Sequence, residues 1–243
     1  MRIEQDGDGL MRVRATAVSK GPGGRALPPS DVTMSSGTAV FVEAETAQRP
    51  TVLGLIVTGR MKPDSGEVAI DDVPDAKQLR RRIALVDAPD VSEPHSDVLL
   101  ADVVAEELMF AGKFGGPPAV RRELERLGLR HHARLPIGDL APGDRVRALC
   151  ELALQRPGVE GIVLVSPDRH GGDPEEWWRT ACELADAGAA VLVIAGRAAR
   201  AAIAAHPDGW GTGEVMPLRE FVAITEETSS RTRALTQHVE DEA

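Results

Sequence analysis

The sequence predicts an α/β protein with a largely parallel sheet that helices cover on both faces. Three short apolar runs, IALV, GIVLV and AVLVIA, are continuous rather than alternating, as is typical of strands buried on both faces. Helical segments separate such runs along the chain, and this alternation favours parallel pairing. Residues 98–153 have helical periodicity throughout, so we expect an inserted helical subdomain there.

The N-terminal part is expected to hold strands of the alternating kind. LMRVRATAV alternates apolar and polar residues, and DVTMSSGTAVFVEA predicts two strands around the Ser36–Gly37 turn. Between these segments, KGPGGRALPPS is dense in glycine and proline, so residues 20–30 are expected to form a loop. Residues 50–59 predict a helix with Pro50 in its first turn, where a missing N–H costs nothing. The next expected elements are a turn at Lys62–Gly66 and strands at Glu67–Asp71 and 83–88.

The helical stretch places apolar residues at i, i+3, i+4 and i+7 in VLLADVVAEELMFAG, and AVRRELERLGL repeats the pattern with charges outside. The segment GGPP, residues 115–118, interrupts these helices. Beyond them we expect a strand at 161–166, a helix at 175–188 and a strand at 189–196. The polar, acidic residues 228–243 are expected to form a flexible tail.

The charge and hydropathy of the sequence indicate which classes of partner the chain is expected to bind. The formal net charge of -10 disfavours a nucleic-acid backbone or an anionic membrane surface. No apolar run approaches the ~20 residues that a membrane span needs, and no signal peptide opens the chain. We therefore expect a cytoplasmic protein without direct membrane insertion, which reaches a membrane only through a partner. Arginine far outnumbers lysine, which suggests a bacterial genome of high GC content.

Four phrases in order along the chain carry a family resemblance: SKGPGGRAL, GRMKPDSGEVAIDD, LRRRIALV and GGDPEEWW. Over about residues 10–200 the chain resembles the nucleotide-binding domain of ABC transporters. The resemblance implies a RecA-like P-loop NTPase core of ABC type, an antiparallel β subdomain and an inserted helical subdomain. In that family two copies close around two ATP molecules. We expect a single domain over 1–227, with the core at about 1–90 and 154–227, the helical subdomain at about 91–153, and the tail at 228–243.

The family's phosphate loop, GxxxxGK[ST], is degenerate here. Its positions correspond to Ala44, Glu45, Thr46, Ala47, Gln48, Arg49, Pro50 and Thr51. Both glycines are absent, and Pro50 replaces the lysine while removing an N–H donor. Glu43 and Glu45 put negative charge beside a site for a polyanion, and only Thr51 matches. Each lost charge-assisted hydrogen bond is worth about 1.5–3 kcal/mol, so ATP binding is expected to be severely weakened.

The other functional motifs implied by the resemblance are degenerate as well. The signature LSGGQ becomes Leu140, Ala141, Pro142, Gly143 and Asp144. The magnesium-binding aspartate and the catalytic glutamate become Ser166 and Pro167, which removes the obvious general base. The positions of the adenine-stacking aromatic, the magnesium-sensing glutamine and the switch histidine hold Pro22, Ala88 and Gly196. Asp173, in the interdomain loop, matches the family.

These replacements favour a degenerate, non-catalytic cassette that acts as a structural or regulatory subunit. It is expected to need no cofactor and to dock a membrane permease or a second, active ABC cassette through a groove lined from about Asp87 to Phe110. The alternative is an atypical ATP-binding subunit that hydrolyses ATP with Mg²⁺, using Arg49, Thr51 and Asp173.

Two rival sites have weaker support from the sequence. VLVSPDRHGG does not match the GxSxG pattern of a serine hydrolase, although Ser166, Asp168 and His170 lie close together. His131 and His132 have no further ligand at metal-binding spacing, so a solvated helix end is the simpler interpretation.

Overall fold

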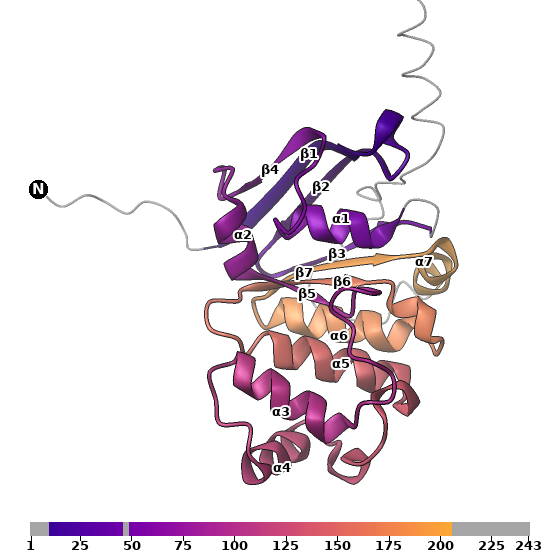
Figure 1. The fold of residues 1–243 in the computed structure, drawn as a ribbon. Helices are drawn as coiled ribbons and strands as arrows, with labels where there is room; N and C mark the ends of the chain where they lie inside the picture. The colour runs from indigo at the N-terminus through magenta and orange to yellow at the C-terminus, as the bar shows by residue number, and fades with distance from the viewer. Residues whose placement is uncertain (1–9, 46–48, 206–243) are drawn as a thin grey trace, which may run out of the picture.

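A computed structural model describes residues 10–45 and 49–205 and has the expected α/β architecture. A three-stranded antiparallel sheet has the order β2-β1-β4, and a four-stranded parallel sheet has the order β3-β7-β6-β5 (Figure 1). The antiparallel strands are β1 (Arg12–Lys20), β2 (Leu27–Ser35) and β4 (Ser65–Ile70). The parallel strands are β3 (Thr38–Glu43), β5 (Ile83–Val86), β6 (Gly161–Val165) and β7 (Ala190–Ala195).

Helices lie on both faces of the parallel sheet. The helices of the described residues are α1 (Pro50–Val57), α2 (Ala76–Arg82), α3 (Leu100–Phe110), α4 (Pro117–Arg126), α5 (Pro142–Ala153), α6 (Pro174–Asp186) and α7 (Arg197–Ala204). Helix α1 lies between the two sheets, α5 and α6 cover the opposite face, and α3 and α4 lie outside them (Figure 1). In the described part of the chain, no helix combines the length and apolar character needed to cross a bilayer.

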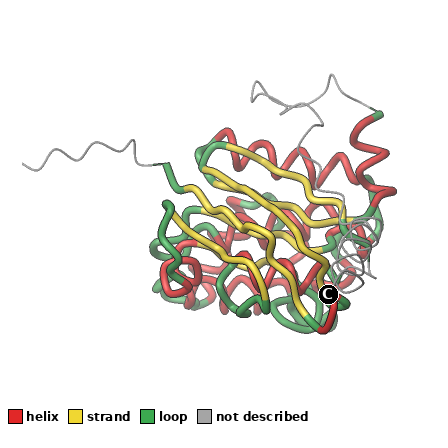
Figure 2. The backbone as a smooth tube through the Cα atoms, turned by 90° about the horizontal axis from the view of Figure 1, so that it is seen from above, coloured by secondary structure: helices red, strands yellow, loops and turns green. Residues whose placement is uncertain are grey.

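The parallel sheet divides the core in two because successive side chains of a strand point to opposite faces. In β6, Ile162 and Leu164 pack against the helices α3 to α6, whereas Val163 and Val165 pack toward α1 and the antiparallel sheet. All five residues of β6 are buried, which explains the continuous apolar run in the sequence. The parallel strands, among those coloured yellow in Figure 2, therefore form the boundary between two apolar clusters.

The expected loop at residues 20–30 is wrong in its second half. Strand β2 begins at Leu27 and includes Pro28 and Pro29, while only the short 3-10 helix Pro22–Gly24 interrupts the chain before it. A strand tolerates these prolines because β2 lies at the edge of its sheet, where a missing N–H removes no ladder bond. Irregular register between β1 and β2 also occurs in this segment, between Ala15 and Lys20.

The predicted strands on either side of the Ser36–Gly37 turn are confirmed, but they belong to different sheets. Strand β2 pairs with β1, whereas β3 pairs in parallel with β7. Gly37 has a φ of 75°, and its N–H donates to the carbonyl of Ala189, 3.0 Å away. The turn thus passes the chain from the antiparallel sheet to the parallel one.

The expected helix at residues 50–59 is confirmed as α1, and Gly54 determines how closely it approaches the sheet. A Cβ atom at Gly54 would lie 2.9 Å from Val165 Cγ2 and 3.1 Å from Leu85 Cδ1. Interiors packed to crystal-like density have no room for such an atom without movement. The glycine is therefore required by packing rather than by the backbone conformation.

We predict that Gly54→Val lowers the free energy of unfolding by about 2 kcal/mol, because the branched side chain overpacks the α1–sheet contact. Ala201→Val, at an exposed position of α7, controls for adding a branched residue to a helix and should cost about 0.5 kcal/mol or less. Urea unfolding followed by circular dichroism measures both changes, and equal losses in the two variants would contradict the packing role of Gly54.

Candidate functional site

The phosphate-loop positions lie between β3 and α1, at the carboxyl edge of the parallel sheet. Ala44 continues β3, and its N–H donates to the carbonyl of Ala195, 2.9 Å away. Arg49 is exposed and left-handed, with a φ of 46°, and Pro50 is buried as the first residue of α1. Thr51 is half-buried. The predicted positions Thr46, Ala47 and Gln48 lie outside the described residues.

Carboxylates of this chain bind backbone N–H groups at the same edge. Asp168 Oδ2 accepts from the N–H of Gly196 at 3.0 Å, and Glu45 Oε1 accepts from the N–H of Arg197 at 2.8 Å. These two donors are at the start of α7, where the helix dipole favours a negative charge. Here the chain supplies that charge itself. A ligand anion would have to displace these carboxylates or bind beside them.

A third carboxylate, that of Glu43, lies beneath this edge. Its side chain is 7% exposed and pairs with Arg197 Nε at 3.1 Å and Arg200 Nη1 at 2.6 Å. A buried carboxylate needs such partners because an unpaired buried charge is strongly unfavourable. Two arginines of α7 therefore bind the end of β3, and this contact fixes the carboxylate close to the phosphate-loop positions.

The signature positions pack against their own chain. Leu140 is buried, Ala141 precedes α5, and Pro142 and Gly143 form its first turn. A Cβ atom at Gly143 would come within 2.6 Å of Glu176 Oε2, so the N-terminus of α6 lies directly against this turn. Asp144 pairs with Arg147 at 2.9 Å. The carboxylates of Asp144 and Glu176 thus lie at the start of α5, close to where the signature would meet a phosphate.

The positions after β6 adopt a tight turn. Ser166 is left-handed, with a φ of 50°, and Pro167 is buried and begins a 3-10 helix. Asp173 is the N-cap of α6 and accepts from the N–H of Glu175 at 2.9 Å. Asp168 binds Gly196 and His170 binds Asp87, so no triad with Ser166 is assembled within the described residues.

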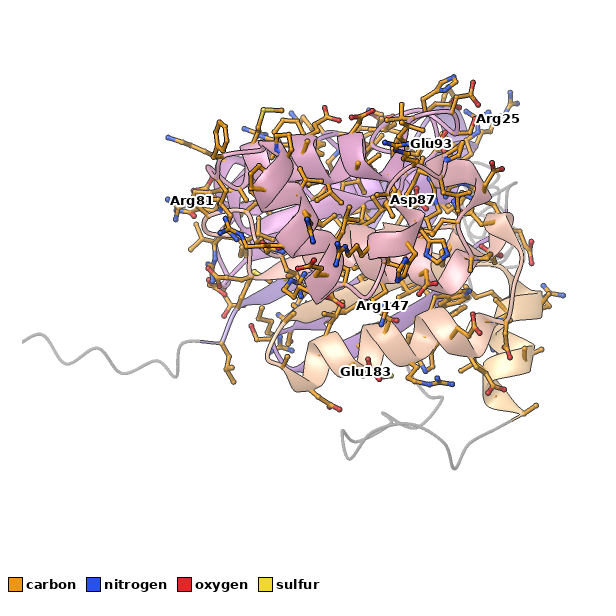
Figure 3. All side chains as sticks on the ribbon, turned by 90° about the horizontal axis from the view of Figure 1, so that it is seen from below. Arg25, Arg81, Asp87, Glu93, Arg147 and Glu183 are labelled. Carbon is orange, nitrogen blue, oxygen red and sulfur yellow. The ribbon has the colours of Figure 1, made fainter. Side chains whose placement is uncertain are left out.

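A buried ionic cluster centred on Asp87 joins three segments. The carboxylate of Asp87 is fully buried and binds Arg145, which is 4% exposed, through Nη2 at 2.7 Å and Nε at 3.3 Å. His170 Nε2 lies 2.8 Å from the same carboxylate, and Arg169 Nη2 lies 3.2 Å from it. Arg169 also pairs with Glu93 at 2.7 Å, and Figure 3 labels Asp87 and Glu93 close together.

The pKa of Asp87 reflects two opposing effects. Burial alone would raise it, but hydrogen bonds from His170 and Arg145, together with the charges of Arg145 and Arg169, hold the pKa below its usual value. The carboxylate therefore stays ionised in the folded protein. Its charge ties the end of β5 to α5 and to the loop after β6.

One feature of the sequence points weakly to this cluster. Arg145 lies in helical register with Leu149 and Leu152, so it occupies the buried face of α5 rather than the solvent side. A charged residue at such a position needs a buried partner. Nothing local to α5 identifies that partner as Asp87, which is 58 residues away.

Within the part of the chain that the structure describes, the two neighbouring histidines belong to no group of potential metal ligands. His131 and His132 lie in the 3-10 helix Arg130–His132. Across residues 10–45 and 49–205, no three His, Cys, Asp or Glu side chains gather at metal-binding distance.

We predict that Asp87→Asn lowers the free energy of unfolding by about 3 kcal/mol at neutral pH, because it leaves Arg145 buried without its counter-charge. The native pKa of Asp87 lies below the unfolded one, so its stabilisation is present above about pH 4 and is lost as the pH falls through the native pKa. The difference in free energy of unfolding between wild type and variant should therefore become smaller as the pH is lowered. Denaturant titrations across pH, with the exposed Asp97→Asn as control, measure this, and a difference that is independent of pH would contradict it.

Comparisons with known proteins bear on the fold. No protein-family model matches the sequence, and no curated protein does either. A nucleotide-free ATP-binding cassette from an ABC transporter superposes with a TM-score of 0.56 at 18% identity, covering 80% of this chain and 84% of that one. The dimeric bacterial cassette MJ0796 superposes with a TM-score of 0.57 at 19% identity, covering 75% of this chain and 87% of that one. CbiO1 from Clostridium perfringens, part of the ABC transporter complex cbiONQ, superposes with a TM-score of 0.54 at 20% identity. The match covers 76% of this chain and 77% of that one. The chain thus has the fold of an ABC transporter ATP-binding cassette.

Proposed function

We propose that this chain is a non-catalytic cassette, a structural or regulatory subunit that requires neither ATP nor Mg²⁺. One observation carries the proposal: Asp168 and Glu45 accept from the N–H groups of Gly196 and Arg197, at the edge where a nucleotide would bring its phosphates. Backbone donors aimed at a phosphate are the main source of affinity in such a cradle. In this chain the cradle positions lack both glycines, and the neighbouring backbone donors at the start of α7 already bind carboxylates.

Electrostatics support the same conclusion. Glu43, Glu45 and Asp168 lie at this edge, and the arginines that reach Glu43 come from α7 rather than from the phosphate-loop helix. Pro50 offers no N–H at the first position of α1. Arg197 and Arg200 are already paired with Glu43, and Pro50 occupies the position of the family's lysine, so a triphosphate would lack the main cation that the family supplies.

The partner we propose is a membrane permease subunit or a second cassette, met in the cytoplasm. Among the structural neighbours, cbiO1 is part of a transporter complex and MJ0796 is a dimer. In this chain the segment from Asp87 to α3 exposes Val91 at 50% and Leu99 at 37%. The buried carboxylate of Asp87 anchors one end of this segment, and Glu93 is held by Arg169. A fixed segment with exposed apolar side chains suits docking because little order must be gained on binding.

Isothermal titration with MgATP tests the absence of nucleotide binding. We expect no heat above the dilution control, and no phosphate release above background, for the chain alone. An intact ABC cassette under the same conditions provides the positive control. Micromolar binding with turnover would overturn the proposal.

The competing function is an atypical ATPase that uses Arg49, Thr51 and Asp173. The observation in its favour is that Arg49 is exposed directly before α1, where a guanidinium could meet a phosphate. If this function is correct, Arg49→Ala should abolish both MgATP binding and turnover, whereas Arg14→Ala, on the exposed side of β1, should leave both unchanged. Binding that survives Arg49→Ala would exclude this role for Arg49.

Co-purification from the native host tests the docking proposal. A tagged chain should retain a permease or a second cassette, and Val91→Asp should reduce recovery about tenfold, since a charge would be buried at the contact. Val73→Asp places the same charge at a position that is 58% exposed in the turn after β4, and it should have little effect. Equal losses in both variants, or recovery of neither kind of protein, would contradict the proposal.

A further inference from the structure

A second apolar surface lies at the end of α3, beyond the segment discussed above. Met109, Phe110 and Phe114 are 60%, 58% and 81% exposed, and they fall within six residues of one another. Single exposed apolar residues are common, but a local concentration of large ones marks a site of interaction. Phe110 is partly covered by Arg156, whose guanidinium carbon lies 5.1 Å from the ring centroid. Phe114 extends from the turn between α3 and α4.

Of these three residues, Phe114 also lines a cavity beside the end of α3. A cavity of about 320 Å³ opens between α3 and α4, with apolar walls formed by Leu108, Phe114, Pro118 and Ala119. Its volume falls at the low end of the range for ligand pockets. The cavity is therefore suited to one or two protruding side chains rather than to an extended ligand.

The glycines of the GGPP segment support one wall of the cavity, the ring of Phe114. Gly116 has a φ of -75°, which any residue can adopt, yet a Cβ atom there would lie 2.1 Å from the ring of Phe114. A Cβ atom at Gly115 would lie 2.6 Å from the carbonyl oxygen of Ala105. Glycine is thus needed at these positions so that the turn can lie on α3 and the Phe114 ring can lie over the turn.

The rim of the cavity is positively charged, in a chain with a formal net charge of -10. Lys113 binds the neutral side chain of Gln155 at 2.5 Å, so its charge is not neutralised by that contact. Arg122 is exposed, and in the described part of the chain it forms no ion pair. The carboxylate at the rim, Glu123, is already held by Arg126 and Gln155. The two cations of the lining, Lys113 and Arg122, outnumber its one carboxylate, Glu123, so the rim favours an anion.

We propose that this cavity docks an acidic amphipathic helix of a partner protein. An apolar side chain of that helix would enter between Phe114 and Pro118, and a carboxylate one turn away would meet Lys113 and Arg122. Such helix-in-groove recognition combines an apolar anchor with flanking charge. A lipid surface fits less well because it would leave the concave cavity unfilled. The surface is distinct from the Asp87–Leu99 segment, and its role does not depend on whether the chain binds nucleotide.

The test uses the full-length chain and two synthetic amphipathic helical peptides with the same leucine face, one flanked by glutamates and one by lysines. Fluorescence anisotropy should show saturable binding of the glutamate peptide alone. Phe114→Ser and Arg122→Glu should each weaken it about tenfold or more. Gly116→Val, which displaces the Phe114 ring without a change of charge, should weaken it similarly. Arg121→Glu makes the same charge change on the neighbouring residue, outside the cavity, and should have little effect. Circular dichroism confirms that each variant is folded.

Several outcomes would overturn the proposal. They are equal binding of the lysine peptide, unchanged binding by Phe114→Ser, equal loss with Arg121→Glu and Arg122→Glu, and no binding of the glutamate peptide. Binding of wild type to phosphatidylglycerol vesicles, with loss of that binding in Phe114→Ser and no peptide binding, would assign the surface to a membrane instead.

Discussion

The buried pair between Asp87 and Arg145 is the contact on which the relation between sheet and helical layer depends. One partner ends β5 and the other lies on the inner face of α5, and both are almost completely removed from solvent. A buried pair adds little net stability compared with an apolar contact of the same shape, but it tolerates very little change in geometry. His170 and Arg169 use the remaining capacity of the carboxylate. The pair therefore contributes more to the orientation of α5 relative to the sheet than to the free energy of unfolding.

Charges at the carboxyl edge of the parallel sheet are also paired within the chain. In a doubly covered sheet this edge is where ligands usually bind, because strand ends and helix starts converge there. Here the convergent donors and cations bind Glu43, Glu45 and Asp168, which belong to the chain. The edge is electrostatically satisfied without a ligand.

Sequence patterns predicted the strands well where burial alone determines them. The runs at β5, β6 and β7 are apolar throughout because both faces of the sheet are covered. Pro28 and Pro29 were assigned to a loop because local propensity carries no information on which strand lies at an edge.

The contacts of the candidate site were harder to predict from the sequence. The phosphate-loop, signature and interdomain positions could be numbered from neighbouring phrases, but their partners could not. The contact between Glu45 and Arg197 spans 152 residues, and that between Asp87 and Arg145 spans 58. A helical pattern records which face is apolar. It does not record which distant charge an arginine on that face will meet.

The Ser36–Gly37 turn has a consequence for how the chain folds. Strand β1 pairs with β2, which follows it closely in sequence. Strand β3 pairs with β7, which is far away in sequence, since Thr38 pairs with Ala190. Pairings between residues so far apart in sequence are entropically costly to close and slow to form. On a ribosome, the antiparallel hairpin can therefore assemble early, while the edge of β3 stays unpaired until most of the chain has emerged. During that interval β3 is open to wrong partners, and a chaperone that shields it would raise the yield of native protein.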